Sequence, residues 1–231
     1  MRKIAAIDIG SNAVRMLICY VLMNEDEYFF QKNQYIRLPL RLGEDSFITG
    51  SISDDKINTL SNALLSFKHT MKVHGVEHYQ IYATSALRDS KNSNDVIKQI
   101  YDLTGMKIKL IDGLKEANVI AMGNPIEKLD VNKTYLYVDV GGGSTEYSIL
   151  RRGDDKKSKS FNIGTVRLIN NLFDESVFDE IKEWINENIE DDLKLKVFAT
   201  GGNINKIQDM TRTKSGKPIS YLSIKDLYNN L

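Results

Sequence analysis

Two short turns in this 231-residue chain bring together an aspartate, glycines and small polar side chains. The first turn runs from Asp8 to Asn12 and the second from Asp139 to Thr145. Glycine lets backbone N–H groups approach an anion closely, because it has no side chain and tolerates a positive φ. One such turn alone is more simply a hairpin turn with a local hydrogen bond, but two matched turns favour phosphate binding. The candidate phosphate donors are Ser11, Asn12, Gly142, Gly143, Ser144 and Thr145.

Two arginines stand near these turns. Arg15 lies in an apolar stretch directly after the first turn, and Arg88 lies in a predicted loop that leaves a strand. Arginine offers a planar fork of donors that matches phosphate oxygens, so both are candidate phosphate ligands. Arg167, in the segment from Gly164 to Leu168, is more simply a surface cation or a member of a structural ion pair.

Acidic side chains that could hold a metal or activate water occur around the same turns. Mg²⁺ prefers carboxylates and water molecules as ligands, and Asp8, Asp139 and Glu146 are the candidates. Glu116 lies on a short predicted helix and could act as a general base. From the local sequence alone, a solvated helix carboxylate beside Lys115 is the better interpretation of Glu116.

A third glycine pair, Gly201 and Gly202, follows a predicted strand at 196–199 and precedes a predicted helix from Ile204. Backbone N–H groups at a helix N-terminus favour anions, so this pair could contact a phosphate or a nucleotide. An ordinary strand-to-helix turn accounts for the pair equally well.

The sequence lacks the residues that other phosphoryl-transfer mechanisms need. The one cysteine, Cys19, is not followed by the arginine of a cysteine-phosphatase loop, and Asp8 has no second acid two residues later. No phosphate loop ending in Gly-Lys-Ser or Gly-Lys-Thr occurs in the sequence. Direct attack by water is the mechanism that remains.

The segments around these motifs alternate between strands and helices, which predicts an α/β fold. An apolar run, a turn and a second run at 4–21 predict a hairpin, and a similar unit begins at 135–138. The break at Asn124 and Pro125 predicts a boundary between an N-terminal domain at 1–124 and a second domain at 125–231. The other expected elements are a strand and loop from Tyr35 to Gly43, helices at 53–74, 95–104, 114–122 and from Ser223, and strands at 79–83 and 107–111.

The composition indicates which partners and which cellular compartment to expect. The 31 acidic and 31 basic residues balance, which gives no global attraction to nucleic acid or to an anionic membrane. No apolar run reaches membrane-spanning length, and a single cysteine suits a reducing cytoplasm. Because the last predicted helix stops at Leu231 without a cap, we expect the second domain to be incomplete.

Six blocks of sequence, in order, resemble the exopolyphosphatase and guanosine pentaphosphate phosphatase family of the actin-like superfamily. The blocks are Asp8 to Arg15, Ala83 to Asn92, Ile111 to Ala117, Val138 to Glu146, Gly164 to Leu168 and Ala199 to Asn203. The resemblance implies two ribonuclease-H-like domains with an active site in the cleft between them. It also implies Mg²⁺-dependent release of terminal phosphate from inorganic polyphosphate or guanosine pentaphosphate, and a homodimer when the protein is full length.

By the same resemblance, Glu116 is the catalytic base that deprotonates water for in-line attack, and Asp139 and Glu146 are essential acids expected around the metal. The phosphate-contacting positions are Ser11, Asn12, Arg15, Arg88, Gly142, Gly143, Ser144 and Thr145. Two residues depart from the family pattern: Lys115 stands where an acid is usual, and Asn118 where a cation is usual. The Lys115 ammonium is expected to lower the pKa of Glu116. A weakly catalytic alarmone-binding protein and a kinase of the same superfamily are the alternatives.

Overall fold

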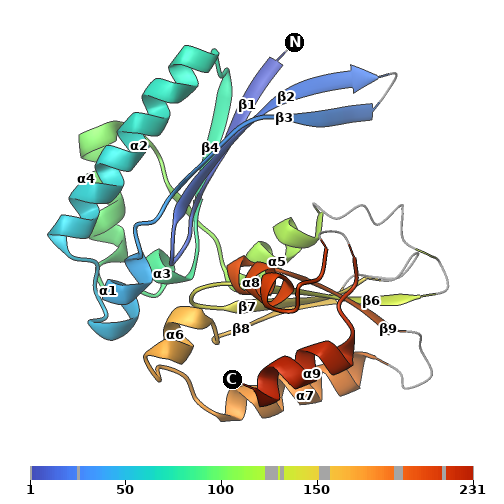
Figure 1. Cartoon of the computed structure of the whole chain (residues 1–231). Helices are drawn as coiled ribbons and strands as arrows, with labels where there is room; N and C mark the ends of the chain where they lie inside the picture. The colour runs from blue at the N-terminus through green and yellow to red at the C-terminus, as the bar shows by residue number, and fades with distance from the viewer. Residues whose placement is uncertain are drawn as a thin grey trace.

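The computed structural model describes residues 2–24, 27–122, 130, 133–150, 157–189, 195–214 and 217–230. The described chain forms two α/β lobes, each built on one mixed sheet (Figure 1). This arrangement confirms the predicted α/β architecture with two lobes. The expected domain boundary at Asn124 and Pro125 lies outside the described residues.

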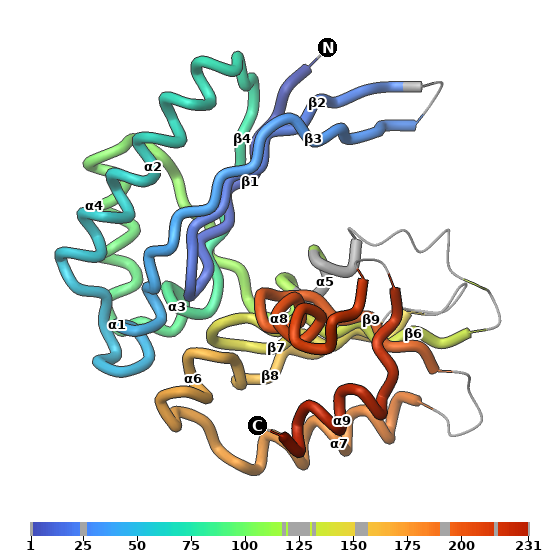
Figure 2. Tube along the Cα trace, in the orientation of Figure 1, coloured from blue at the N-terminus to red at the C-terminus, as the bar shows by residue number. Residues whose placement is uncertain are grey.

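The first lobe is a five-stranded sheet with helices on one face. Its strands are β1 (Arg2–Ile9), β2 (Val14–Asn24), β3 (Glu27–Leu38), β4 (His78–Ala83) and β5 (Lys109–Leu110), in the order β3-β2-β1-β4-β5. β1 pairs antiparallel with β2 and parallel with β4, so the hairpin and the crossover strand meet at β1. The helices α2 (Asp54–His74) and α4 (Ser93–Thr104) lie side by side over this sheet (Figures 1 and 2).

Local sequence signals explain the long helix α2. The Ser53 hydroxyl accepts a hydrogen bond from the Lys56 N–H at its start, and Gly75 ends it with a φ of 68°. Only glycine takes this left-handed conformation without strain, which makes it a common helix stop. The apolar face of α2, including Leu60, Leu64 and Phe67, is buried against the sheet.

The second lobe repeats the hairpin and the crossover strand. Its strands are β6 (Thr134–Val140), β7 (Thr145–Leu150), β8 (Lys157–Phe161) and β9 (Leu195–Thr200), in the order β8-β7-β6-β9. Figure 1 shows α7 (Ser176–Asn188) and α9 (Tyr221–Asn229) on one side of this sheet, with α5 (Gly113–Met122) and α8 (Gly202–Met210) on the other. Although α5 precedes the second hairpin in the chain, it packs on β7 and β8.

The lobes meet through short helices. α1 (Leu42–Ile48) and α3 (Ser85–Arg88) of the first lobe pack together, and α6 (Thr165–Ile169) of the second lobe packs on α1. This junction lies beside the two hairpin turns, so it fixes how the turns approach each other (Figures 1 and 2).

Four expectations differ from the structure. The segment from Leu42 is a helix and not a loop, and Arg88 ends the short helix α3 and does not lie in a loop. The strand expected at 107–111 is shorter, and it pairs with β4 at Lys109 and Leu110, opposite Tyr82 and Ala83. α9 starts at Tyr221, two residues before the predicted Ser223, because the Ser220 hydroxyl provides the N-terminal cap. Among the described helices, none is both long and apolar enough to cross a membrane.

Candidate active site

The two turns singled out in the sequence occupy equivalent places in the two lobes. Each closes a hairpin: the Gly10 N–H donates to the Ala13 carbonyl at 3.1 Å, and the Gly141 N–H donates to the Ser144 carbonyl at 2.9 Å. The register is also the same, because Asp8 lies opposite Arg15 in the first hairpin and Asp139 lies opposite Glu146 in the second. The internal repeat is therefore a structural one.

The first hairpin contains an ion pair between Arg15 and Asp8. The Arg15 Nη1 donates to Asp8 Oδ2 at 2.7 Å, and the two side chains are 41% and 44% exposed. Arg15 and Asp8 thus bind each other in the described state, so a phosphate or a metal would compete with this pair. Ser11 is buried, and its hydroxyl pairs with the Ser85 hydroxyl at 3.0 Å.

The second hairpin holds two carboxylates in fixed orientations. Glu146 is 2% exposed, and its Oε1 accepts from the Ser144 hydroxyl at 2.6 Å and from the Ser160 hydroxyl at 2.9 Å. Burial raises the pKa of Glu146, these two hydroxyls oppose that rise, and the charge of Asp139 adds to it. A buried carboxylate with one oxygen held by two hydroxyls has a defined direction for its other oxygen.

Asp139 is oriented by a chain of hydroxyl groups. The Thr200 hydroxyl donates to Asp139 Oδ1 at 2.5 Å and also pairs with the Tyr137 hydroxyl at 2.8 Å. Thr200 ends β9, which runs parallel to β6 and places Thr200 opposite Asp139. The threonine of the third glycine motif therefore orients the acid of the second turn.

Glu116 projects from the first turns of α5 toward these acids. α5 begins at a capped end, because Asp112 Oδ1 accepts from the Lys115 N–H at 2.7 Å. The Glu116 side chain is 16% exposed, and its Oε2 is buried without a hydrogen-bond partner among the described residues. The Arg88 Nη1 lies 3.7 Å from this oxygen, within ion-pair range but too far for a hydrogen bond.

The environment of Glu116 favours its protonated form. Burial and the charges of Glu146, Asp8 and Asp139, opposed by the charge of Arg88, together raise the pKa of Glu116 to about 8. A carboxyl that loses its proton near neutral pH is suited to general-base work. The expected lowering of this pKa by Lys115 is wrong, because the Lys115 ammonium lies 5.9 Å from the centroid of the Tyr82 ring on an exposed side of α5.

Arg88 is held at the end of α3 by three contacts. Its Nε donates to Asp89 Oδ1 at 3.0 Å and its Nη1 donates to the Ile111 carbonyl at 3.1 Å, in addition to the Glu116 contact. The Ile111 bond joins Arg88 to the segment that leads into α5. Arg88 and Glu116 are therefore positioned by the same connection between the lobes.

The glycines of the second turn lie against the first lobe. A Cβ at Gly142 would lie 2.9 Å from Ser11 Cβ and 3.2 Å from Asn12 Nδ2. These approaches leave space for glycine alone, and they place three of the candidate phosphate donors, Ser11, Asn12 and Gly142, beside one another. The Thr145 hydroxyl instead donates to the Ile163 carbonyl at 2.6 Å within the second lobe.

The third glycine pair forms a tight turn between β9 and α8. Gly201 has a φ of 111°, and a Cβ there would lie 2.4 Å from the Val140 carbonyl oxygen. Gly202, in contrast, has no atom within 4 Å of its Cβ position. The turn thus needs glycine at 201 for packing, and the predicted phosphate or nucleotide contact at Gly201 and Gly202 stays a prediction.

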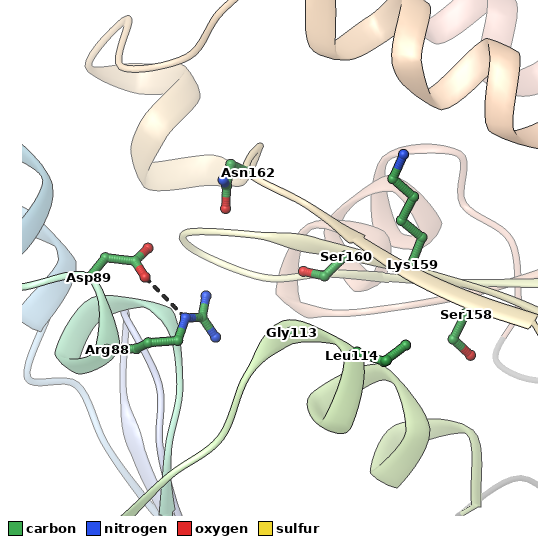
Figure 3. Close-up of a pocket in the computed structure, with 8 residues that line it drawn as sticks. All are labelled: Arg88, Asp89, Gly113, Leu114, Ser158, Lys159, Ser160 and Asn162. Atoms are coloured by element: carbon green, nitrogen blue, oxygen red, sulfur yellow. Dashed lines mark hydrogen bonds and ion pairs between the residues drawn. The ribbon is translucent and has the colours of Figure 1, made fainter.

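A cleft of about 410 Å³ opens beside Arg88 and the start of α5 (Figure 3). It is lined by Arg88, Asp89, Gly113, Leu114, Ser158, Lys159, Ser160 and Asn162. Figure 3 shows the Arg88 guanidinium reaching from the first lobe toward Gly113, while the Lys159 side chain points away from Leu114 on the far side of β8. Residues of both lobes therefore form this cleft, next to the serine that holds Glu146.

The residues of the site can be compared with those that a divalent cation needs. Within the described part of the chain, no three His, Cys, Asp or Glu side chains are gathered as a metal-binding group. Four carboxylates nevertheless act on one another, since Asp8, Asp139 and Glu146 all raise the pKa of Glu116. Carboxylates are the ligands that Mg²⁺ prefers, and its charge would offset this repulsion.

Several functional contacts were not foreseen in the sequence. Asp89, Ser160 and Thr200 each hold a predicted site residue, and Phe47 lies under the Arg167 guanidinium. Asp89 directly follows Arg88 and Thr200 precedes the third glycine pair, so both stood in motifs without an assigned role. Ser160 and Phe47 carry no local signal, because their partners lie far away in the chain.

The sequence and the fold both match known proteins. The model of the Ppx/GppA phosphatase family matches residues 22–215. A bifunctional 3-dehydroquinate synthase/phosphatase of Fusobacterium nucleatum is 33% identical over 200 residues, which are 81% of this chain and 30% of that protein. Exopolyphosphatase 2 of Mycobacterium tuberculosis is 30% identical over 176 residues, 73% of this chain and 54% of that protein.

The fold agrees with that of a solved structure. An exopolyphosphatase from Cytophaga hutchinsonii superposes with a TM-score of 0.82 at 22% identity, over 99% of this chain and 79% of that one. The chain spans 30% and 54% of the length of the two sequence relatives named above. Because the family model matches residues 22–215, which are most of the chain, the chain belongs to the Ppx/GppA phosphatase family.

Proposed function

We propose that the protein hydrolyses the terminal phosphate of inorganic polyphosphate, with Glu116 as the base that activates water. The observation that carries the proposal is the buried Glu116 Oε2, which has no hydrogen-bond partner among the described residues. A buried acceptor without a partner is costly, and a water molecule would satisfy it. The raised pKa of Glu116, about 8, supports a base that takes and returns a proton near neutral pH.

The proposed reaction proceeds by in-line attack. The proton of the bound water passes to Glu116 Oε2 as the water oxygen forms a bond to the terminal phosphorus. The bond from that phosphorus to the bridging oxygen breaks, and the shortened chain leaves with the electron pair. Arg88, 3.7 Å from Glu116 Oε2, supplies positive charge beside the attacking group. The products are orthophosphate and a polyphosphate one unit shorter.

Asp139 and Glu146 are the residues that would hold Mg²⁺. Bound there, the ion would neutralise charge on the phosphoryl oxygens. The hydroxyls of Ser144, Ser160 and Thr200 fix the directions of both carboxylates. Asp8 is less suited as a ligand, because its Oδ2 accepts a short hydrogen bond from Arg15.

The phosphate contacts are proposed for the two turns and the two arginines. Ser11 and Asn12 of the first lobe lie beside Gly142 of the second, which supports phosphate contacts from both lobes. The terminal phosphate of guanosine pentaphosphate carries the same anhydride bond, and the same residues would cleave it. Which substrate is preferred is decided by competition between them in one assay.

The test is orthophosphate release by the purified protein with Mg²⁺ and each substrate. Glu116→Gln keeps the size of the side chain but cannot accept a proton, so we expect a loss of roughly 10²- to 10⁴-fold. Glu183→Gln, on the exposed side of α7, is the matched control and should keep full activity. Unchanged activity in Glu116→Gln would refute the assigned base. Nucleotide binding without phosphate release would instead support the alarmone-binding alternative.

A further inference from the structure

Arg167 makes three contacts that join the two lobes. It lies in α6 of the second lobe, and its Nε donates to the Gly143 carbonyl at 2.8 Å. Its Nη2 donates to Asp89 Oδ2 of the first lobe at 2.9 Å, and its guanidinium carbon lies 4.2 Å from the centroid of the Phe47 ring. One side chain thus connects the glycine turn of the second lobe to an acid and a ring of the first.

The contacts are partly shielded from water. The side chains of Arg167 and Asp89 are 17% and 29% exposed, which places the pair outside the class of fully solvated surface ion pairs. A guanidinium stacked on a ring keeps its planar fork in one orientation, so its hydrogen bonds are directional. These features distinguish Arg167 from a solvated surface cation.

The glycine turn leaves no space between the lobes at this point. A Cβ at Gly143 would lie 2.3 Å from Phe47 Cζ and 2.6 Å from Ser85 Oγ. The turn therefore sits in direct contact with α1 and α3, and Arg167 holds the same residue by its carbonyl oxygen. The turn therefore makes the contact between the lobes, and this contact fixes its position.

Asp89 extends this connection to the proposed base. Its Oδ1 accepts from Arg88 Nε at 3.0 Å while its Oδ2 accepts from Arg167. Arg88 in turn faces Glu116 Oε2 at 3.7 Å. A single carboxylate is shared between an arginine at the reaction centre and an arginine of the opposite lobe, so a movement of one lobe is transmitted to Arg88.

We propose that Phe47, Asp89 and Arg167 form an interlobe clasp that holds the lobes closed and fixes Arg88 beside Glu116. Asp89 and Arg167 are then positioning residues, because they act through Arg88 and through the Gly143 turn. The effect of the clasp on the reaction rests on the proposed function, whereas its effect on the lobes does not.

The test of closure needs no substrate. Spin labels are placed at Val73→Cys on α2 and Tyr228→Cys on α9, sites that are 85% and 80% exposed, in a Cys19→Ser background. The distance between the two labels is measured by pulsed electron paramagnetic resonance. It is measured in the labelled parent protein and in the labelled variants Asp89→Asn, Arg167→Gln and the double variant. We expect a longer mean distance with a broader distribution in each single variant, and no further change in the double variant.

A matched control and a conservative variant keep the test decisive. Glu77→Gln removes an exposed contact to Arg2 within the first lobe and should leave the distance unchanged. Arg167→Lys keeps the charge but cannot reach Gly143 and Asp89 with one planar fork, so an intermediate distance is expected. Circular-dichroism melting curves identify any variant that fails to fold, and Arg167→Lys then replaces Arg167→Gln in the comparison.

Activity measured on the same variants separates the clasp from the proposed function. With phosphate release as the readout, kcat should fall roughly 10- to 100-fold in both single variants, because misplacement of about 1 Å at a reaction centre has an effect of this size. Distances that equal those of the parent in both single variants would overturn the clasp, whatever the rates are. Altered distances in a protein without phosphate release would uphold the clasp and reject the function.

Discussion

Replacing Glu116 by glutamine should stabilise the protein at alkaline pH while it removes activity. The pKa of Glu116 is raised from an ordinary 4.5 to about 8 in the folded state. A raised folded pKa contributes stability that is fully present below pH 4.5 and is lost as the pH rises through about 8. The difference of about 3.5 pKa units corresponds to an upper limit of roughly 5 kcal/mol, at 1.36 kcal/mol for each unit.

The size of the expected effect is smaller than this limit. The pKa of Glu116 is shared with the acids around it, so we expect roughly 2 kcal/mol, which is less than half of this limit. Glutamine carries no charge at any pH, so the variant avoids the cost that the ionised Glu116 imposes. For a chain of this size, roughly 2 kcal/mol corresponds to an increase of about 4 to 8 °C in Tm.

The assay is thermal unfolding of parent and variant between pH 5 and pH 9, in a buffer with a chelator so that metal binding does not contribute. The difference in Tm should grow from pH 5 to pH 8 and level off above it. Glu183→Gln on exposed α7 is the control, and its difference should stay flat across the range. A Glu116→Gln variant with the same or lower Tm than the parent at pH 9 would refute the idea of a strained, buried base.

The remaining predictions concern the carboxylates of the second hairpin. Adding Mg²⁺ should raise the Tm of the parent protein more at pH 9 than at pH 5, because the ion binds ionised carboxylates, and Asp139→Asn should remove the increase. Thr200→Val deletes the 2.5 Å hydrogen bond to Asp139 while it keeps the shape of the side chain, so phosphate release should fall roughly 10-fold or more at saturating polyphosphate. A Thr200→Val variant with unchanged release and unchanged Mg²⁺ dependence would show that Asp139 needs no such support.

Local patterns predicted most of the fold. The cap at Ser53 and the stop at Gly75 bound α2 as expected, because both signals act within one helical turn of the end. The two hairpins and their equivalent turns followed from short apolar runs and glycines. The helix from Leu42 was missed because its start has no side-chain cap and Arg41 takes a φ of 54°.

Contacts between distant segments could not be predicted in this way. Asp89 and Arg167 lie 78 positions apart and meet because α3 and α6 both pack on α1 where the lobes join. The Lys115 prediction failed for a related reason: adjacent helix residues point in different directions, so Lys115 reaches Tyr82 while Glu116 faces the acids. Burial has the largest effect on the pKa of Glu116, followed by the charges of Glu146 and Arg88, and Lys115 is not among the causes.

The internal repeat explains why the proposed site needs both lobes. Arg15 and Glu146 occupy the same register position in the two hairpins, opposite Asp8 and Asp139. The first hairpin therefore holds a paired cation and anion, whereas the second holds two anions. A phosphate chain needs cations around it and a metal needs anions, but the anion of the first hairpin is already paired with Arg15, and the second hairpin places two anions opposite each other. Only contact between the lobes brings the cations of the first to the acids of the second, which is why residues that hold this contact should affect catalysis without touching the substrate.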